Sequence, residues 1–400
     1  MPLSKESVVS SALSNPSIGW LRADDCDLNE FIAIVEQPTL LADYPHAATV
    51  DRGVLVYDSA TLATAVAQAT QRRTVEAELA RALLHGPGVF VIKAAFPDTA
   101  IVDRVTDVFS GIISDQRASG AVAGDHFAKP GANDRIWNAL EKLALRDADA
   151  FAEYYTNDML ALASHAWLGP GYQITSQVNQ VNPGGAAQLA HTDYHLGFMD
   201  NETAEQYPAH VHALSPVLTL QGAVAHCDMP VESGPTLYMP HSQKYPLGYL
   251  AWRNHDFRGY FDANHVQLPL KKGDAVFFKP SLFHAAGHNR TTDVHRIANL
   301  LQVSSAFGRA IETVDRHAMV TAVYPSLLDR KAAGVAERDL HNVVAASAEG
   351  YAFPTNLDRD QPVGGLAPES QAALTWRALQ EGWPADVLAA ELDAYRHRRS

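Results

Sequence analysis

The stretch AQLAHTDYHLGF, residues 187–198, places His191, Asp193 and His195 at every second position. On an extended strand alternate side chains share one face, so His191 and Asp193 would point the same way. Two such ligands begin the triad of two histidines and one carboxylate, which leaves positions open on Fe(II) for other ligands and oxygen. Taken alone the pair is weak evidence, because the chain has 18 histidines and a polar strand face needs no metal.

A second group of candidates lies in KKGDAVFFKPSLFHAAGHNRTTDVHRIANLLQVSS, residues 271–305. Here a loop with His284 and His288 precedes a predicted strand, on which Arg296 leads a face of small and apolar residues. A buried arginine needs an anion, and its planar guanidinium suits a carboxylate. A dicarboxylate 2-oxoacid would satisfy both sites, with one end on the metal and the far carboxylate on Arg296. An internal Asp or Glu is the alternative partner.

The elements that must position these residues change in character along the chain. Residues 1–170 carry helical patterns and one apolar strand, and we expect a helical and mixed support region packed on a core. From 171 to 306, short apolar or alternating runs end at Gly, Pro, Asn or Asp, which is typical of a β-sandwich or barrel. Residues 307–400 form a predicted helical extension. The sequence therefore predicts a mainly β fold with flanking helices, built as a single integrated domain.

The composition indicates a soluble globular protein, with 47% hydrophobic and 19% charged residues. A formal charge of −14 argues against sequence-blind binding to nucleic acid or to an anionic membrane, because the long-range field has the wrong sign. Two distant cysteines, Cys26 and Cys227, make no disulfide framework. We find neither a signal peptide nor the roughly 18 apolar residues of a membrane span. We expect a cytoplasmic protein, and the oligomeric state stays open.

Three motifs, in the same order over residues 171–305, resemble the phytanoyl-CoA dioxygenase family of Fe(II)/2-oxoglutarate oxygenases. They are HTD, CDMPVESGPTLYMPHSQKY, and GDAVFFKPSLFHAAGHN with an arginine after it. The resemblance implies a double-stranded β-helix, also called a jelly roll. It also implies His191, Asp193 and His284 as the iron ligands and Arg296 as the anchor of 2-oxoglutarate.

The choice between His284 and His288 rests on the third motif, because His284 lies five residues before Asn289, as the family's distal ligand does. His288 is then expected in the loop. Two positions depart from the family. Ala286 stands where a hydroxyl residue often helps to hold 2-oxoglutarate, and Thr192 stands where these hydroxylases often carry Gln. We assign Thr192 to the 2-oxoglutarate site, and further support must come from other residues.

The predicted strand SQVNQVNPGG, residues 176–185, offers four amide side chains that split between its two faces: Gln177, Asn179, Gln180 and Asn182. Amides donate hydrogen bonds to carboxylates without neutralising the charge of a metal. By analogy we expect Gln180 or Asn182 near 2-oxoglutarate and Gln177 near the substrate. His195 would also face the substrate if its strand stays regular. If the strand breaks at HLGF, His195 is a structural hydrogen-bonding group.

The segment GDHFAKPGANDRIWNALEKL, residues 124–143, lies outside the three motifs, and its polar and aromatic residues beside Gly and Pro suggest an ordered loop that enters a helix. Lys129, Arg135 and Trp137 are candidates for a lid over the site. Helix capping by Asn133 or Asp134 is the alternative use of this segment.

The residues and the resemblance together predict an Fe(II)- and 2-oxoglutarate-dependent dioxygenase that hydroxylates an unactivated C–H of a small molecule, with release of succinate and CO2. Asp193 favours hydroxylation or desaturation, because related halogenases replace this carboxylate with a small residue. One alternative is a cupin-like metal-dependent hydrolase or isomerase without 2-oxoglutarate, in which Arg296 would lose its purpose. Another is a binding module with incidental histidines. The sequence does not identify the substrate. The acidic chain shows no cradle for a polyphosphate, which argues against an acyl-CoA, and small polar metabolites and natural-product intermediates stay open.

Overall fold

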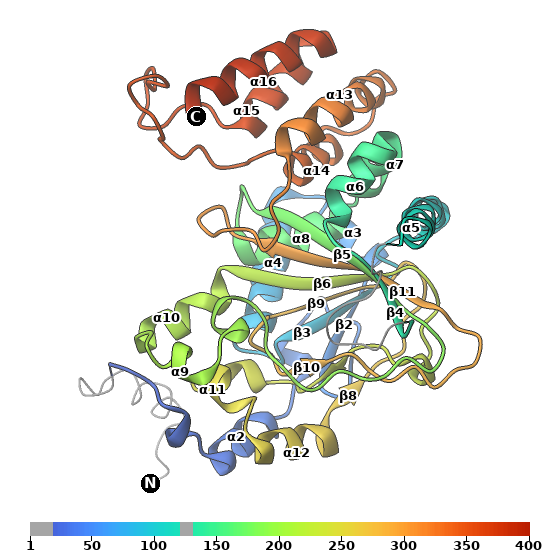
Figure 1. Ribbon diagram of the computed structural model, residues 1–400, viewed down its shortest axis with the longest axis vertical. Helices are drawn as coiled ribbons and strands as arrows, with labels where there is room; N and C mark the ends of the chain where they lie inside the picture. The colour runs from blue at the N-terminus through green and yellow to red at the C-terminus, as the bar shows by residue number, and fades with distance from the viewer. Residues whose placement is uncertain (1–18, 121–130) are drawn as a thin grey trace.

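The computed structural model of the protein describes residues 19–120 and 131–400. Within these residues, eight strands form a large mixed sheet in the order β1-β2-β3-β9-β6-β11-β5-β4, and a small sheet has the order β10-β7-β8 (Figure 1). The strands of the large sheet are β1 (Thr49–Asp51), β2 (Val54–Asp58), β3 (Val89–Lys93), β4 (Asn133–Ile136), β5 (Gln173–Val181), β6 (Thr219–Ala225), β9 (Ala275–Phe278) and β11 (Arg296–Ser304). Those of the small sheet are β7 (Leu237–Tyr238), β8 (Val266–Gln267) and β10 (His284–Ala285).

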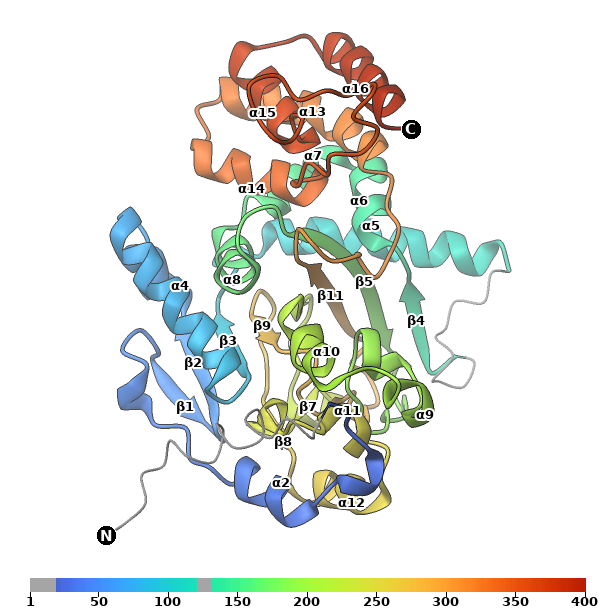
Figure 2. The ribbon, with the colours of Figure 1, turned by 90° about the vertical axis from the view of Figure 1, so that its left-hand side faces the viewer.

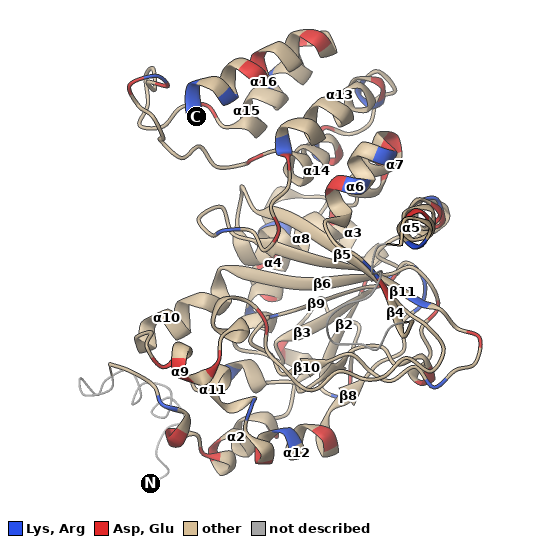
Figure 3. Cartoon of the chain, in the orientation of Figure 1, with Lys and Arg blue, Asp and Glu red and all other residues tan. Residues whose placement is uncertain are grey.

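Helices surround the large sheet, and the last four, α13 to α16, lie at the top of both ribbon views, where α13 and α14 pack against earlier helices (Figures 1 and 2). The α-helices are α2 (Leu28–Val35), α3 (Ser59–Ala65), α4 (Ala69–Leu84), α5 (Ala100–Ala118), α6 (Ala139–Arg146), α7 (Ala148–Tyr155), α8 (Asp158–Leu168), α9 (Asn201–Ala204), α10 (Ala209–Leu214), α11 (Gly248–Ala251), α12 (His255–Asn264), α13 (Arg316–Ala332), α14 (Glu337–Ser347), α15 (Gln371–Glu381) and α16 (Ala385–Arg399). Charged residues of both signs lie mostly on helices and loops, and the central strands are largely uncharged (Figure 3).

The two faces of the large sheet bury different partners, because successive side chains of a strand point to opposite sides. One face contributes Leu220, Phe277 and Leu301 to the main apolar cluster, which the surrounding helices complete. The opposite face contributes Val276 and Phe278 to a smaller cluster that includes residues from the small-sheet region. We call this second face the inner face.

Helices flank a large sheet, as the sequence predicts, and this sheet is wider than the sequence indicated. The prediction of a mainly β fold is wrong, because helical residues outnumber strand residues in the ranges 19–120 and 131–400. Residues 49–136 supply four of its strands, with β3 paired to β9 and β4 paired to β5. The pair β2–β3 is parallel, so the chain between them must cross over, and α3 and α4 make this crossover. No helix of the ranges 19–120 and 131–400 is long and apolar enough to cross a bilayer.

A buried histidine of the helix-covered face makes stability depend on pH. The ring nitrogens of His226 bond the hydroxyls of Thr106 at 2.8 Å and Tyr154 at 3.0 Å, and burial lowers the pKa of His226 to about 3. In the unfolded chain the pKa is about 6.5. Stability is therefore present above pH 6.5 and is lost as the pH falls toward 3, because the unfolded chain binds the proton first.

Between pH 7 and pH 5 we expect His226 to lower the free energy of unfolding by about 2 kcal/mol. Chemical denaturation at both values of pH measures this change. A His226→Gln variant, which has no titrating ring, should lose correspondingly less over the same interval. Equal losses in the variant and the parent would show that this ring does not remain neutral in the fold.

Candidate metal centre

The structure brings His191, Asp193 and His284 together from two distant parts of the chain. His191 and His284 face each other across an antiparallel bridge, with N–O distances of 2.9 Å and 3.1 Å and ring centroids 4.4 Å apart. The Asp193 carboxylate lies 3.4 Å from Nε2 of His284 and 3.8 Å from Nε2 of His191. One possible ligand atom from each residue lies within 4.8 Å of the other two, so a single cation can contact all three.

Each histidine is held by its other ring nitrogen. Nδ1 of His191 lies 2.8 Å from the carbonyl of Leu189, and Nδ1 of His284 lies 2.8 Å from the carbonyl of Leu282. A carbonyl can only accept, so each Nδ1 carries the proton and each Nε2 presents its lone pair to a metal. Burial lowers the pKa of His191, which keeps that imidazole neutral as a metal requires.

The carboxylate of Asp193 is ionised and anchored. Burial acts to raise its pKa, but the contact with His284, the nearby His191 and the amide of Gln221 outweigh it and hold the pKa well below its usual range. Nε2 of Gln221 donates to the Asp193 carboxylate at 2.5 Å. The triad thus offers two neutral imidazoles and one anion, the donor set of non-heme Fe(II) sites.

Gln221 lies on β6 and is a residue that sequence reasoning missed. The signal was a single amide inside the apolar run SPVLTLQGAVA, residues 215–225. A polar side chain on a fully buried strand needs a partner, and here that partner is Asp193, a candidate metal ligand.

Replacing Gln221 with leucine should weaken Fe(II) binding by about 10- to 100-fold, the usual effect of losing a partner that orients a metal ligand. Leucine keeps the volume but cannot donate to Asp193. An anaerobic Fe(II) titration measures the affinity, with Gln206→Leu on the exposed surface as the matched control. Unchanged affinity in Gln221→Leu would mean that the bond does not position Asp193.

The expected regular strand over 188–195 is absent from the described structure, where only His191 forms a bridge. The backbone turns at Tyr194 and His195, whose φ angles of +65° and +41° end an extended conformation, and a 3-10 helix covers His195–Phe198. Nδ1 of His195 bonds the Ser215 hydroxyl at 2.9 Å. The alternation that would aim His195 at the substrate is therefore missing, and the structure places it as a hydrogen-bonding group.

Arg296 begins β11 and is buried on the inner face. Burial lowers its pKa to about 10. Among residues 19–120 and 131–400, no Asp or Glu forms an ion pair with its guanidinium. Tyr238, which pairs with His284 in the small sheet, lies close enough to interact with this charge. A buried guanidinium beside the triad fits the far carboxylate of 2-oxoglutarate.

The strand register decides which amides share the inner face with Arg296. Asn179 lies opposite Ala298 and Gln177 opposite Leu300, so both amides face the same side as Arg296. Gln177 accepts a hydrogen bond from Arg135 of β4. This agrees with the expectation that Gln177 lies on the substrate side, which stays a prediction.

The prediction that Gln180 lies near 2-oxoglutarate is wrong. Gln180 lies opposite Ile297 and therefore points to the helix-covered face of the sheet. Its amide donates to Asp134 at 3.3 Å and to Asn182 at 3.1 Å. Asn182 in turn donates to Asp134 at 3.1 Å. The side chains of Gln180 and Asn182 thus both bond Asp134, which also pairs with Arg117 at 2.5 Å. Neither amide has a hydrogen bond to a residue of the triad among the described residues.

Thr192 and His288 complete the sequence candidates. Thr192 is buried between the two ligands and its hydroxyl has no hydrogen-bond partner, so its assignment to 2-oxoglutarate stays a prediction. His288 is exposed, whereas His284 is buried in the triad. Asn289 next to it donates to the carbonyls of Val181, Asn182 and Val294, and thereby fixes the loop that leads to β11.

The proposed lid segment is described only from residue 131 onward, and Lys129 lies outside the described residues. The Arg135 guanidinium lies 4.8 Å from the Trp137 ring centre. Asn133 and Asp134 belong to β4 and do not cap a helix, because Asn133 donates to Asn179 and Asp134 pairs with Arg117.

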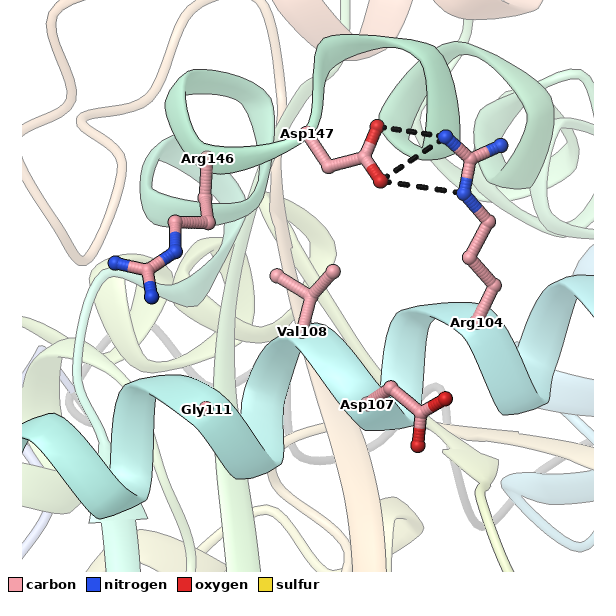
Figure 4. A pocket seen from close by; sticks show the side chains of 6 residues that line it. All are labelled: Arg104, Asp107, Val108, Gly111, Arg146 and Asp147. Atoms are coloured by element: carbon pink, nitrogen blue, oxygen red, sulfur yellow. Dashed lines mark hydrogen bonds and ion pairs between the residues drawn. The ribbon is translucent and has the colours of Figure 1, made fainter.

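A separate surface hollow lies between α5 and the turn from α6 to α7, away from the triad (Figure 4). It is lined by Arg104, Asp107, Val108, Gly111, Arg146 and Asp147. Arg104 is bound to Asp147 at 2.8 Å, and Arg146 is bound to Asp115 at 3.0 Å. Its two arginines are thus paired within the protein, so the hollow offers no free cation to a ligand.

Some solved structures are similar to this chain at low sequence identity. The epimerase SnoN, described as non-heme alpha ketoglutarate dependent and from nogalamycin biosynthesis, is 19% identical, with 58% of this chain and 84% of that chain covered and a TM-score of 0.41. The carbocyclase SnoK is 19% identical, with 57% and 83% covered and a TM-score of 0.37. EvdMO1 is 18% identical, with 57% and 50% covered and a TM-score of 0.40.

No sequence among curated proteins matches the chain. The family described as phytanoyl-CoA dioxygenase (PhyH) matches residues 53–298, which is more than half of the chain and contains the triad and Arg296. The protein therefore belongs to the phytanoyl-CoA dioxygenase family, with Fe(II) and 2-oxoglutarate as its metal and cosubstrate.

Proposed function

We propose that the protein hydroxylates an unactivated C–H of a small-molecule substrate and releases succinate and CO2. One observation supports this proposal. The triad of two neutral imidazoles, His191 and His284, and the carboxylate of Asp193 lies on the same side of the sheet as a buried arginine, Arg296, which has no carboxylate partner among the described residues. When bound, iron with 2-oxoglutarate and O2 supplies the oxidising power for a C–H bond. The large and small sheets are, in this proposal, the two layers of a double-stranded β-helix.

The residues of the chain divide the work. His191, His284 and Asp193 would hold the metal, and a set of three protein ligands would leave room for the cosubstrate and oxygen. Arg296 binds the far carboxylate of 2-oxoglutarate and thereby orients the 2-oxoacid end toward the metal. The ring of Phe278, whose centre lies 4.8 Å from that of the His284 ring, belongs to the smaller apolar cluster on the inner face of the sheet. This cluster would keep water away from the His284 side of the site.

Two features favour hydroxylation over the other candidate reactions. The carboxylate of Asp193 occupies the ligand position that a halogenase keeps open for a halide. A metal-dependent hydrolase or isomerase without 2-oxoglutarate needs no buried guanidinium, and burying one without an anion costs free energy. The position of Arg296 therefore supports an enzyme with an anionic cosubstrate.

We also propose that 1–170, 171–306 and 307–400 fold as one unit. The main apolar cluster supports this, because it contains buried residues from all three ranges, from Tyr44 to Tyr395.

A screen of small metabolites for substrate-stimulated succinate formation, with Fe(II), 2-oxoglutarate and O2, tests the proposed function. Oxygen-18 from O2 should appear in the product as a hydroxyl group. The His284→Ala protein in the same screen controls for adventitious iron. Succinate formation that does not depend on the triad, or an activity that needs no 2-oxoglutarate, would refute the proposal.

A further inference from the structure

Some buried polar atoms of residues 19–120 and 131–400 have no hydrogen-bond partner, and one group of them lies in segments around the candidate metal centre. Such atoms are rare in folded proteins, because a buried donor or acceptor without a partner loses its hydration without compensation. Seven of them belong to the triad segment, to β6 and β11, and to the loop that follows β11. They are Thr192 Oγ1, Tyr194 OH, Thr219 Oγ1, Gln221 Oε1, Gln302 Oε1, Ser304 Oγ and Glu312 Oε2. We call these seven residues the polar wall.

Strand register places the four sheet members of the wall in one patch of the inner face. Thr219 lies opposite Ser304, and Gln221 lies opposite Gln302. Since directly opposed residues of antiparallel strands point to the same side, their side chains lie together. Gln221 also bonds Asp193, so this patch starts at a metal ligand.

Tyr194 extends the wall from the metal toward the loop after β11. It directly follows Asp193 and its side chain is buried. Its hydroxyl lies near that of Ser304, so these two groups can interact weakly with each other but form no well-aligned hydrogen bond. Asp193 and Glu312 both lie near enough to act on the charge of this hydroxyl. The φ angle of +65° at Tyr194 is unusual for an aromatic residue, and such strain is characteristic of functional sites.

Glu312 closes the wall from the segment between β11 and α13. Its Oε1 accepts a hydrogen bond from the backbone N–H of Asn138 at 2.8 Å. Its Oε2 is buried and accepts no well-formed hydrogen bond from the described residues, although the amide of Gln177 lies near the carboxylate. Burial raises the pKa of Glu312, while Gln177 and Arg135 lie near it and act in the opposite direction. The segment is thus held in place by one oxygen, and the other remains as an acceptor.

The chemistry of these atoms defines what the wall can bind. The unsatisfied atoms of Gln221, Gln302 and Glu312 can only accept hydrogen bonds, and the four hydroxyls can donate or accept. A ligand that satisfies them must bring several donors of its own. A fatty acyl chain has none and would leave the buried amide oxygens of Gln221 and Gln302 without a donor.

We propose that the polar wall binds the substrate through hydroxyl or amine groups, with Glu312 as the residue that selects for them. This inference rests on the proposed function, because it assigns a substrate class to the same metal centre. Since the wall starts at Asp193 and Gln221, the C–H that reacts lies in a hydroxylated or aminated part of the substrate. Free sugars, inositols, amino sugars and polyamines all present this chemistry.

The test uses the full-length protein with Fe(II) and 2-oxoglutarate in the absence of oxygen, so that binding is measured without turnover. Three sets of probes are compared by equilibrium binding and by the melting temperature. They are polyols (free sugars and inositols), amines (amino sugars and polyamines) and medium-chain fatty acids with their amides. We expect polyols or amines to bind and to raise the melting temperature, whereas the acyl set does neither.

Variants of Glu312 then separate the two donor types. Glu312→Gln keeps an acceptor oxygen but removes the charge, so it should weaken an amine probe by about 10- to 100-fold and a polyol by less than about 10-fold. Glu312→Ala should weaken both by about 10-fold or more. Glu141→Gln is the matched control, because Glu141 also bonds Asn138 and the segment before α13, through Nδ2 of Asn138 at 3.0 Å and the N–H of Asp315 at 2.7 Å.

The outcome is decisive in each case. Binding of the acyl set alone, absence of binding by every polyol and amine, or unchanged polar binding in both Glu312 variants would overturn the proposed substrate class. In all variants 2-oxoglutarate should bind as in the parent protein, which shows that the fold is intact. If the parent protein does not bind 2-oxoglutarate, that result would instead refute the proposed function.

Discussion

A His284→Ala protein is expected to lose 2-oxoglutarate-dependent succinate formation by a factor of at least about 100, since even the partners that orient metal ligands reach that effect. The physical reason is the geometry of the triad. His284 supplies a neutral imidazole whose Nδ1 is tied to Leu282, and its Nε2 lies 3.4 Å from the Asp193 carboxylate. Without this ring, His191 and Asp193 remain as two ligands, and two ligands hold a divalent metal poorly.

The matched control for this variant is His288→Ala, because His288 lies four residues further along the same segment and is exposed. It should keep the parent affinity for Fe(II), measured by anaerobic titration, and the parent rate of succinate formation. Full iron affinity in His284→Ala together with a loss in His288→Ala would transfer the third ligand to His288.

Replacing Arg296 with alanine should weaken 2-oxoglutarate binding by about one to three orders of magnitude. A charge-assisted hydrogen bond contributes roughly 1.5–3 kcal/mol, and about 1.4 kcal/mol corresponds to a factor of ten. Arg296→Lys should restore only part of the affinity, because an ammonium group cannot supply the planar fork. Fe(II) affinity should stay near the parent value, since the guanidinium is no ligand.

The Arg296→Ala change should also affect the melting temperature in a way that differs from the loss of a purely structural arginine. Its guanidinium is buried, and no carboxylate among the described residues neutralises it. Removing a buried charge without a partner relieves its desolvation, so the Arg296→Ala protein without ligands should melt at or above the parent temperature. Saturating 2-oxoglutarate should then raise the melting temperature of the parent much more than that of the variant.

Arg290→Ala, in the exposed loop before β11, is the matched control for both measurements. It should behave as the parent protein does. Unchanged 2-oxoglutarate affinity in Arg296→Ala would remove the main reason for an oxygenase, and the metal-dependent hydrolase or isomerase would become the better explanation.

The metal triad could be expected from the sequence because its chemistry is local. The spacing of His191 and Asp193 puts both side chains near one point for any extended backbone. His284 and Arg296 belong to one continuous motif, and the element between them is short. Residue type and spacing suggested His191 and Asp193, whereas the resemblance to the family implied His284 and Arg296. The structure places one possible ligand atom of each triad residue within 4.8 Å of the other two.

The sequence could not show to which face of the sheet each side chain of a strand points. Gln180 and Gln177 are equally polar neighbours on β5, and the pairing of β5 with β11 decides which of them shares a face with Arg296. A slip of one residue in that register would exchange the two faces. The same limit applies to His195, where the turn at Tyr194 ends the alternation that a regular strand would have continued.

By itself, the sequence determined the types of the ligands, the candidate anchor Arg296 and a sheet with helices on its flanks. Only the tertiary structure brought Gln221 to Asp193 and the N–H of Asn138 to Glu312, because these contacts join segments that are far apart in the sequence. It also decided that β1 to β4 widen the sheet, since strand order depends on long-range pairing. The types of the candidate ligands follow from residue type and spacing. The burial of these ligands and their hydrogen-bond partners follow from how distant segments pack, and this packing forms the surroundings of the metal centre.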